Sequence, residues 1–100
     1  MNEKLLSLLG IARRAGRLSL GFDAAADSMR SGQCRLLLIA VDLSERSKRS
    51  ISRTAQQTQT RTIVLNMPMD TLGAAIGKLT GIVAVNDKGF AEKMITLCGE

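Results

Sequence analysis

The sequence has no histidine, tryptophan or tyrosine, and it has only two cysteines in 100 residues. Cys34 and Cys98 are far apart and form no C-x-x-C pair, so without histidine a zinc site is not expected. The lack of histidine also removes the commonest general base, and no serine or cysteine has an identifiable base partner. The sequence therefore does not predict an enzyme, and we expect both thiols to be reduced and packed as small hydrophobic groups.

Long apolar runs and nucleotide-binding loops are absent as well. No run approaches the ~20 residues that span a bilayer, and the N-terminus shows no signal-peptide pattern. No G-x-G-x-x-G or Walker loop follows an expected strand. We therefore expect a cytoplasmic protein with no cofactor, no small-molecule substrate and no membrane partner. Its length predicts a single domain over residues 1–100, and we expect a monomer.

Aromatic residues are scarce, whereas positive charge is in excess. Phe22 and Phe90 are the only aromatics, which argues against a base-stacking platform for single-stranded RNA. The net charge of +5 points to a polyanionic partner. The basic residues fall into two clusters, Arg13, Arg14 and Arg17 in one and Arg46, Lys48, Arg49 and Arg53 in the other. Solvated helix faces are the alternative explanation, but two clusters on either side of a glycine-bearing turn favour RNA phosphates.

The longest apolar stretch runs from Arg35 to Asp42 and predicts a central strand covered on both faces. Shorter apolar strands are expected over residues 18–20, 62–65 and 82–85. Helical periodicity separates them, over residues 2–16, 23–31, 44–58, 70–79 and from 87 onward. We expect Asn2, Asp23, Asp70 and Asp87 to cap four of these helices and Ser44 to open the remaining one. Strands interleaved with helices predict a three-layer α/β/α sandwich.

Three glycine-bearing segments are candidates for function. At Leu20–Ala24 a strand turns abruptly into a helix, which leaves N–H groups available to phosphate or base acceptors. The helix at Leu72–Gly77 accepts two glycines at a cost of about 1 kcal/mol each, either for a close approach to a ligand or for packing. The segment Val83–Ala91 is interpreted as a structural strand-to-helix joint.

Three aspartates, Asp23, Asp27 and Asp42, are conceivable as an acid–base or Mg²⁺ set. A helix cap at Asp23 and a strand-ending turn at Asp42 explain two of them without any chemistry. We therefore favour structural roles for these carboxylates.

Five segments of the sequence, taken in their order and spacing, resemble a known protein family. The stretches Leu9–Gly16, Gly21–Asp23, Leu37–Asp42, Leu72–Gly77 and Val83–Ala91 together resemble the bacterial YlxQ-type ribosomal-protein-like family, over nearly the whole chain. That family belongs to a wider class of archaeal and eukaryotic large-subunit ribosomal proteins that bind kink-turn RNA. The resemblance implies a four-stranded mixed sheet of order 1-4-2-3. It also implies RNA contact at one edge, from the Gly21 turn, the Ser44 loop and the loop that enters the Leu72–Gly73 helix.

The wider class reads sheared G·A pairs with a Gly-x-Asn-Glu motif and a lysine one turn later. The matching positions in this sequence are Gly21, Phe22, Asp23, Ala24 and Asp27, of which only the glycine is kept. The segment 66–69 departs as well, because related loops more often carry a basic or hydroxyl residue there. These departures predict weak kink-turn binding.

The resulting hypothesis is a non-catalytic, ribosome-associated protein that binds structured RNA, with ribosomal RNA a candidate. Among the expected RNA-binding residues, Gly21 and Asp23 contact base edges, and Arg13, Arg14, Arg17, Arg46 and Lys48 contact phosphates. Met67, Met69 and Leu72 form an apolar rest for an extruded nucleotide. The other expected site residues lie at the motif positions or in the adjoining loops: Phe22, Ala24, Asp27, Ser44 and Gly73. The alternative is a protein-interaction module that has kept the fold and lost the RNA site.

Overall fold

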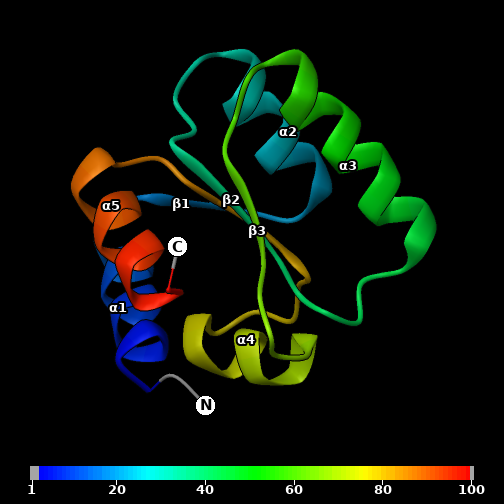
Figure 1. The fold of residues 1–100 in the computed structure, drawn as a ribbon. Helices are drawn as coiled ribbons and strands as arrows, with labels where there is room; N and C mark the ends of the chain where they lie inside the picture. The colour runs from blue at the N-terminus through cyan, green and yellow to red at the C-terminus, as the bar shows by residue number, and fades with distance from the viewer. Residues whose placement is uncertain (1–2, 100) are drawn as a thin grey trace.

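The computed structural model describes residues 3–99, and within them five helices alternate with four strands (Figure 1). In chain order these are α1 (Glu3–Arg14), β1 (Leu18–Leu20), α2 (Phe22–Arg30), β2 (Leu36–Ile39), α3 (Glu45–Gln57), β3 (Thr62–Val64), α4 (Met69–Ile76), β4 (Ile82–Val85) and α5 (Lys88–Leu97). The predicted order of elements is confirmed. Asn2, the expected cap of α1, lies outside the described residues.

The four strands form one mixed sheet in the order β1-β4-β2-β3. β4 pairs antiparallel with both β1 and β2, whereas β2 and β3 run parallel. β2 and β4 are thus the inner strands, and every residue of both is buried. The strand order implied by the family resemblance is confirmed, as is a central strand covered on both faces.

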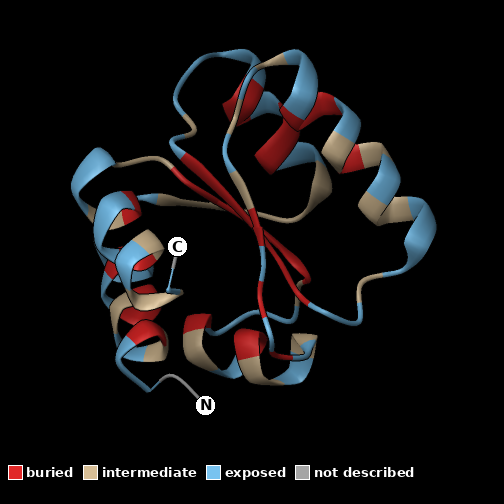
Figure 2. Ribbon diagram, in the orientation of Figure 1, coloured by how far each residue is buried: buried red, intermediate tan, exposed pale blue. Residues whose placement is uncertain are grey.

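Helices cover both faces of the sheet, as Figures 1 and 2 show. Along β2, Leu36 and Leu38 pack into a core shared with α1, α4 and α5. Leu37 and Ile39 point the other way, into a smaller core with α2 and α3. Because successive side chains of a strand point to opposite faces, the residues of β2 enter the two cores alternately. The predicted three-layer α/β/α sandwich is confirmed.

Two of the predicted helix caps are confirmed. The side chain of Ser44 accepts a hydrogen bond from the N–H of Ser47 at the start of α3, at 3.2 Å. The carboxylate of Asp87 accepts one from the N–H of Phe90 at the start of α5, at 2.9 Å. Both side chains satisfy an N–H that the helix itself leaves unpaired.

The other two predicted caps are wrong. Asp23 lies inside the first turn of α2, whose N-cap is Gly21. Asp70 lies inside the first turn of α4, whose N-cap is Pro68. The predicted end of α4 is also wrong: the helix stops at Ile76, because Gly77 adopts a left-handed conformation with φ +80°. Leu79, expected on the buried face of that helix, is 68% exposed.

The joint between β4 and α5 is structural, as predicted. The amide of Asn86 donates to the hydroxyl of Ser19 at 2.8 Å, and its oxygen accepts a hydrogen bond from the hydroxyl of Ser28. One side chain therefore ties β1, the end of β4 and α2 together. Ser28 is one of only two buried polar residues among residues 3–99, and its hydrogen bond to Asn86 satisfies its hydroxyl.

The two cysteines are partly buried against the two cores, as small hydrophobic groups would be. Burial raises the pKa of the Cys34 thiol above its ordinary value, and the thiol donates to the carbonyl of Leu36 at 3.3 Å. Among residues 3–99, no helix has the length and apolarity needed to cross a membrane.

Candidate nucleic-acid interface

Four loops meet at one end of the sheet. Strands β1, β2 and β3 end there and β4 begins there, as their pairing registers require. We call this surface the loop edge; it comprises residues 21–24, 40–44, 65–69 and 77–81. Backbone hydrogen bonds hold the loops together: Gly21 donates to Ile82, Ala40 to Gly81 and Val41 to Met67, at 2.9, 2.9 and 3.0 Å.

A side chain completes this assembly. Asp42, at the end of the β2 segment, accepts a hydrogen bond from the N–H of Met69 at 2.9 Å. It thereby caps α4 from a different loop, which explains why Pro68 can occupy the N-cap position. This carboxylate is therefore structural. No group of three metal-ligating side chains that could hold an ion occurs within residues 3–99.

Gly21 shapes the start of α2 through its backbone. Its φ of +91° lies in a region that L side chains rarely adopt, while a Cβ at this position would meet nothing within 4 Å. The glycine is thus required by conformation and leaves open space above it. Gly21 carries no side chain to cap α2, and Asp23 and Ala24 in the first turn are exposed. The first N–H groups of the helix consequently face the loop edge.

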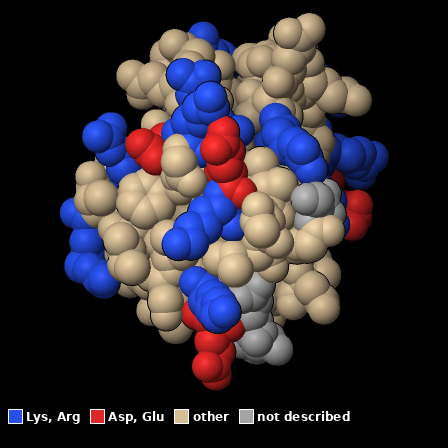
Figure 3. Space-filling view, turned by 60° about the vertical axis from the view of Figure 1, so that its left-hand side comes forward, with Lys and Arg blue, Asp and Glu red and all other residues tan. Residues whose placement is uncertain are grey.

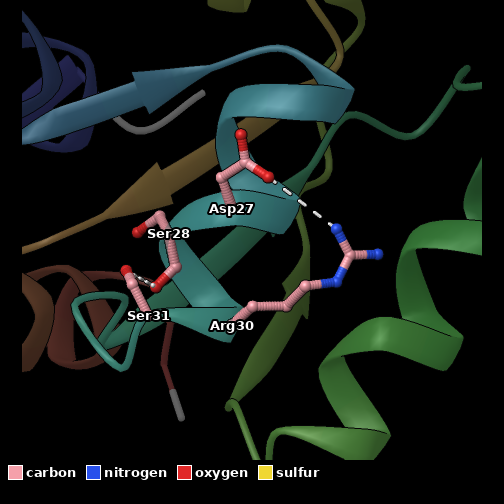
Figure 4. A network of polar contacts seen from close by, with 4 residues as sticks. All are labelled: Asp27, Ser28, Arg30 and Ser31. Carbon is pink, nitrogen blue, oxygen red and sulfur yellow. Dashed lines mark hydrogen bonds and ion pairs between the residues drawn. The ribbon is translucent and has the colours of Figure 1, made fainter.

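Asp27, one turn further along α2, is paired. Its carboxylate lies 3.8 Å from the guanidinium of Arg30, and both side chains are largely exposed (Figure 4). Ser31 closes the helix nearby, its hydroxyl donating to the carbonyl of Ser28 at 3.1 Å. Arg30 is not among the predicted site residues, although an i, i+3 spacing to Asp27 is a sequence signal for such a pair. The negative charge of Asp27 is therefore partly offset.

The predicted apolar rest for a nucleotide needs correction. Leu72 is completely buried and Met67 is 4% exposed, because both belong to the core beneath α4. Met69 is half-buried and lies against Gly81, where a Cβ would meet its sulfur at 2.8 Å. The large apolar side chains that the loop edge does expose are Leu79 and Val41, at 68% and 47%. Reading Gly77 as the helix end would have placed Leu79 in the loop.

Gly73 has a close neighbour within the protein. A Cβ on this buried glycine would lie 3.0 Å from the Cα of Leu79 and 3.1 Å from the carbonyl oxygen of Lys78. The chain thus folds back across α4 directly after Gly77, and Gly73 allows that approach. Packing against its own chain, and not a close approach to a ligand, therefore explains the glycine at position 73.

The two basic clusters lie at different places. Arg17 is at the opposite end of β1 from Gly21, where its carbonyl accepts from the N–H of Asn86 at 2.8 Å. Four residues of extended chain separate Arg17 from Gly21 by about 13 Å. Figure 3 shows basic side chains spread over a face of the molecule with acidic ones among them. Arg13, Arg14 and Arg17 therefore lie outside the loop edge.

The second cluster begins at the loop edge. Ser44 is the N-cap of α3, so Arg46 and Lys48 lie within one turn of the loop that follows β2. Arg46 is exposed, whereas Lys48 is partly covered and lies 3.7 Å from the carboxylate of Glu45. This cluster is consequently the one that adjoins the loop edge.

Comparison with known proteins identifies the fold. The sequence profile of the Ribosomal protein L7Ae/L30e/S12e/Gadd45 family matches residues 3–95. The chain belongs to this family. A large part of its length is thus accounted for by one family domain, and the predicted resemblance to the YlxQ-type group is supported by the relatives described next.

This L7Ae-family chain is 33% identical to the RNA-binding protein YlxQ of Bacillus subtilis over 97 residues, which cover 90% of each protein. It is 28% identical to the large ribosomal subunit protein eL30 of Eremothecium gossypii, over 95% of this chain and 92% of that protein. A solved structure of a Bacillus halodurans protein of unknown function superposes with a TM-score of 0.90 at 32% identity, covering 97% of this chain and 98% of that one. The two named relatives are an RNA-binding and a ribosomal protein, and neither is named as an enzyme.

Proposed function

We propose that this protein binds structured RNA at the loop edge, as a non-catalytic, ribosome-associated member of the L7Ae family in the cytoplasm. One observation carries the proposal: two loops at the same end of the sheet hold Gly21, with open space above it, and the exposed Leu79. Support comes from the relatives, which are named as ribosomal and RNA-binding proteins. A net charge of +5 favours the same polyanionic partner.

The proposed contacts follow from the chemistry of the exposed groups. The N–H groups at the start of α2 and the carboxylate of Asp23 meet base edges, where donors and acceptors carry sequence information. Arg46 and Lys48 meet phosphates, which position the RNA. Leu79 and Val41 form the apolar surface for an unstacked nucleotide. Kink-turn RNA is the structured RNA that we propose as the reference ligand, bound weakly by a monomer.

Replacing Leu79 with serine tests the site. Because this side chain is 68% exposed, the change leaves the fold stable, whereas the loss of apolar area that a bound base would bury costs about 1 kcal/mol. We expect RNA affinity to fall about fivefold or more in a titration of labelled kink-turn RNA. Ile11→Ser is the matched control, since Ile11 is 47% exposed on α1, and it leaves binding unchanged.

The protein-interaction alternative makes a different prediction. If the RNA site has been lost, structured RNA does not raise the melting temperature of the protein. If RNA binds, the melting temperature rises with RNA concentration and the rise disappears in high salt. Equal effects of Leu79→Ser and Ile11→Ser would show that the loop edge is not where RNA binds.

A further inference from the structure

A shallow hollow of about 590 Å³ lies between α3 and the start of β3, at the sheet edge opposite β1. Its walls include Lys48, Arg49, Ser52, Arg53, Gln56 and Thr60. We call it the α3 groove. The proposed RNA contacts at the loop edge do not use it beyond Lys48, at its near end.

The chemistry of the α3 groove matches a phosphodiester chain. Three of its nine lining residues are basic, five others carry hydroxyl or amide groups, and none is acidic. Such a surface offers positive charge and neutral hydrogen-bond donors together, which are the groups that phosphate oxygens accept. The ninth, Ala55, is 3% exposed, so the apolar surface of the groove comes mainly from the carbon parts of its basic and polar side chains. With three basic residues and no acidic one in its lining, the groove favours a polyanionic chain over a neutral peptide strand.

The arginines of α3 also form a continuous stripe. Arg46, Arg49 and Arg53 follow each other at i, i+3 and i+7, so they lie on one side of the helix. A second hollow of about 350 Å³ is lined by Arg46, Arg49, Ser50 and Arg53. Arg49 and Arg53 therefore lie between two hollows and can donate into either. Their forked guanidinium groups match the geometry of phosphate oxygens better than lysine does.

The direction of α3 connects this stripe with the loop edge. The helix begins after Ser44, at the loop edge, and ends at Gln57, near the other end of the sheet, where the carbonyl of Arg61 accepts from the N–H of Leu37. Thirteen residues of helix span about 20 Å. The α3 groove consequently leads away from the loop edge, alongside β3, over a length of several nucleotides.

We propose that the α3 groove binds the sugar–phosphate backbone of the RNA segment that flanks the element held at the loop edge. This inference rests on the proposed RNA-binding function and extends it to a second contact surface. Since the groove offers charges and hydrogen bonds to the backbone alone, the contact is independent of base sequence. The affinity for an RNA then depends on its length beyond the bound element.

The test compares two charge-matched double variants. Arg49→Gln with Arg53→Gln removes two positive charges from the α3 groove, and Lys88→Gln with Lys93→Gln removes two from α5, on the other face of the sheet. Each protein is titrated with a kink-turn hairpin and with the same hairpin lengthened by about six base pairs, roughly the length of the groove. Glutamine keeps the helix propensity of the residues that it replaces, and melting curves check the fold.

The expected result is specific to length. The unaltered protein and the lysine variant bind the longer RNA more tightly than the shorter one, whereas the arginine variant loses this gain. On the longer RNA, its negative slope of log K against log[salt] becomes shallower by about 1.5 to 2, as expected for two lost phosphate contacts. Replacing Arg49 and Arg53 with lysine restores most of that slope, because the charge returns.

Three outcomes would overturn the inference, and they are separable. If the unaltered protein binds neither RNA, the proposed function fails and this inference fails with it. If it binds both RNAs and the two double variants behave alike, only the α3 groove is excluded. If the arginine variant keeps its RNA affinity but loses binding to an oligoglutamate peptide, the groove belongs to an acidic protein partner instead.

Discussion

Gly73 illustrates how a single missing Cβ can determine a loop. The backbone of Lys78 and Leu79 lies within 3.0–3.4 Å of the position that a Cβ would take. Helix propensity alone predicts that Gly73→Ala stabilises the protein by about 1 kcal/mol. Because the clashing atoms are backbone, we expect the opposite, a loss of about 1 to 3 kcal/mol in the free energy of unfolding. Urea denaturation measures this free energy. A gain in stability would show that the backbone of Lys78 and Leu79 shifts to accommodate the methyl group.

Asp42 holds two loops together with one hydrogen bond, to the N–H of Met69 at 2.9 Å. We expect Asp42→Ala to lower the free energy of unfolding by about 1 kcal/mol, as the loss of a helix cap does. Asp70→Ala is the control, since Asp70 contributes only its charge near the start of the same helix, worth about 0.3–1 kcal/mol in low salt. Asn at position 42 keeps the acceptor and rescues most of the loss. Equal, salt-sensitive losses for both alanine variants would contradict the cap.

The helix-capping residues show which residue roles can be predicted from the sequence. Asp87 and Ser44 directly precede their helices, and both caps were predictable from local pattern. Asp23 and Asp70 each lie two residues beyond the N-cap of their helix, a difference that helix periodicity does not resolve. The capping role of Asp42 depends on a residue 27 positions away. Contacts of that kind depend on the fold and not on local sequence.

At the scale of elements, burial explains what was predictable. The apolar run of β2 is buried throughout, so its position and its two covered faces follow from the sequence. The end of α4 was misplaced because Leu79 continues the apolar period of that helix, while the left-handed Gly77 stops it. That one error also hid the exposed apolar side chain at the loop edge. The sequence therefore predicted the glycine turn of the loop edge but not the exposure of Leu79 beside it.

The residues at the start of α2 allow a prediction of how tightly the protein binds kink-turn RNA. Relative to the Gly-x-Asn-Glu motif and its lysine, this helix has Asp23, Ala24 and Asp27, all exposed. Two lost base contacts at about 1 kcal/mol or more each, together with an opposing charge, cost roughly two decades of affinity. We expect micromolar or weaker kink-turn binding. The triple change Asp23→Asn, Ala24→Glu and Asp27→Lys should raise the affinity at least tenfold at fixed salt.

The control for that triple variant is Glu92→Lys on α5, which raises the net charge by the same two units on the other face of the sheet. It separates a restored contact from a general gain in charge. The Asp27–Arg30 pair is lost in the triple variant, but exposed pairs contribute little stability, so the fold remains intact. Nanomolar binding by the unaltered chain would show that its site reads RNA differently. An equal gain in the control would show that α2 does not face the RNA.

For the molecule as a whole, charge is distributed in a way that sequence spacing does not show. Both basic clusters flank the Gly21 turn along the chain, yet only the cluster on α3 adjoins the loop edge in space. In the other cluster, Arg13 and Arg14 form the last turn of α1 and Arg17 directly precedes β1, at the end of that strand away from Gly21. Helix direction and strand register decide this, and both depend on the tertiary fold. The overall charge therefore points to a polyanionic partner but does not predict which surface would bind it.

Salt dependence tests this distribution. If about four to six basic residues contact phosphates, log K against log[salt] falls with a slope of roughly −4 to −5. We expect Arg46→Gln with Arg53→Gln to make the slope shallower by about 1.5 to 2, because both lie on the stripe that starts at the loop edge. Arg13→Gln with Arg17→Gln should change it by less than about 0.5, since those side chains lie at the far end of β1. Equal changes in both double variants would mean that the RNA extends across β1 as well. A slope near zero for the unaltered protein would exclude RNA phosphates as its partner.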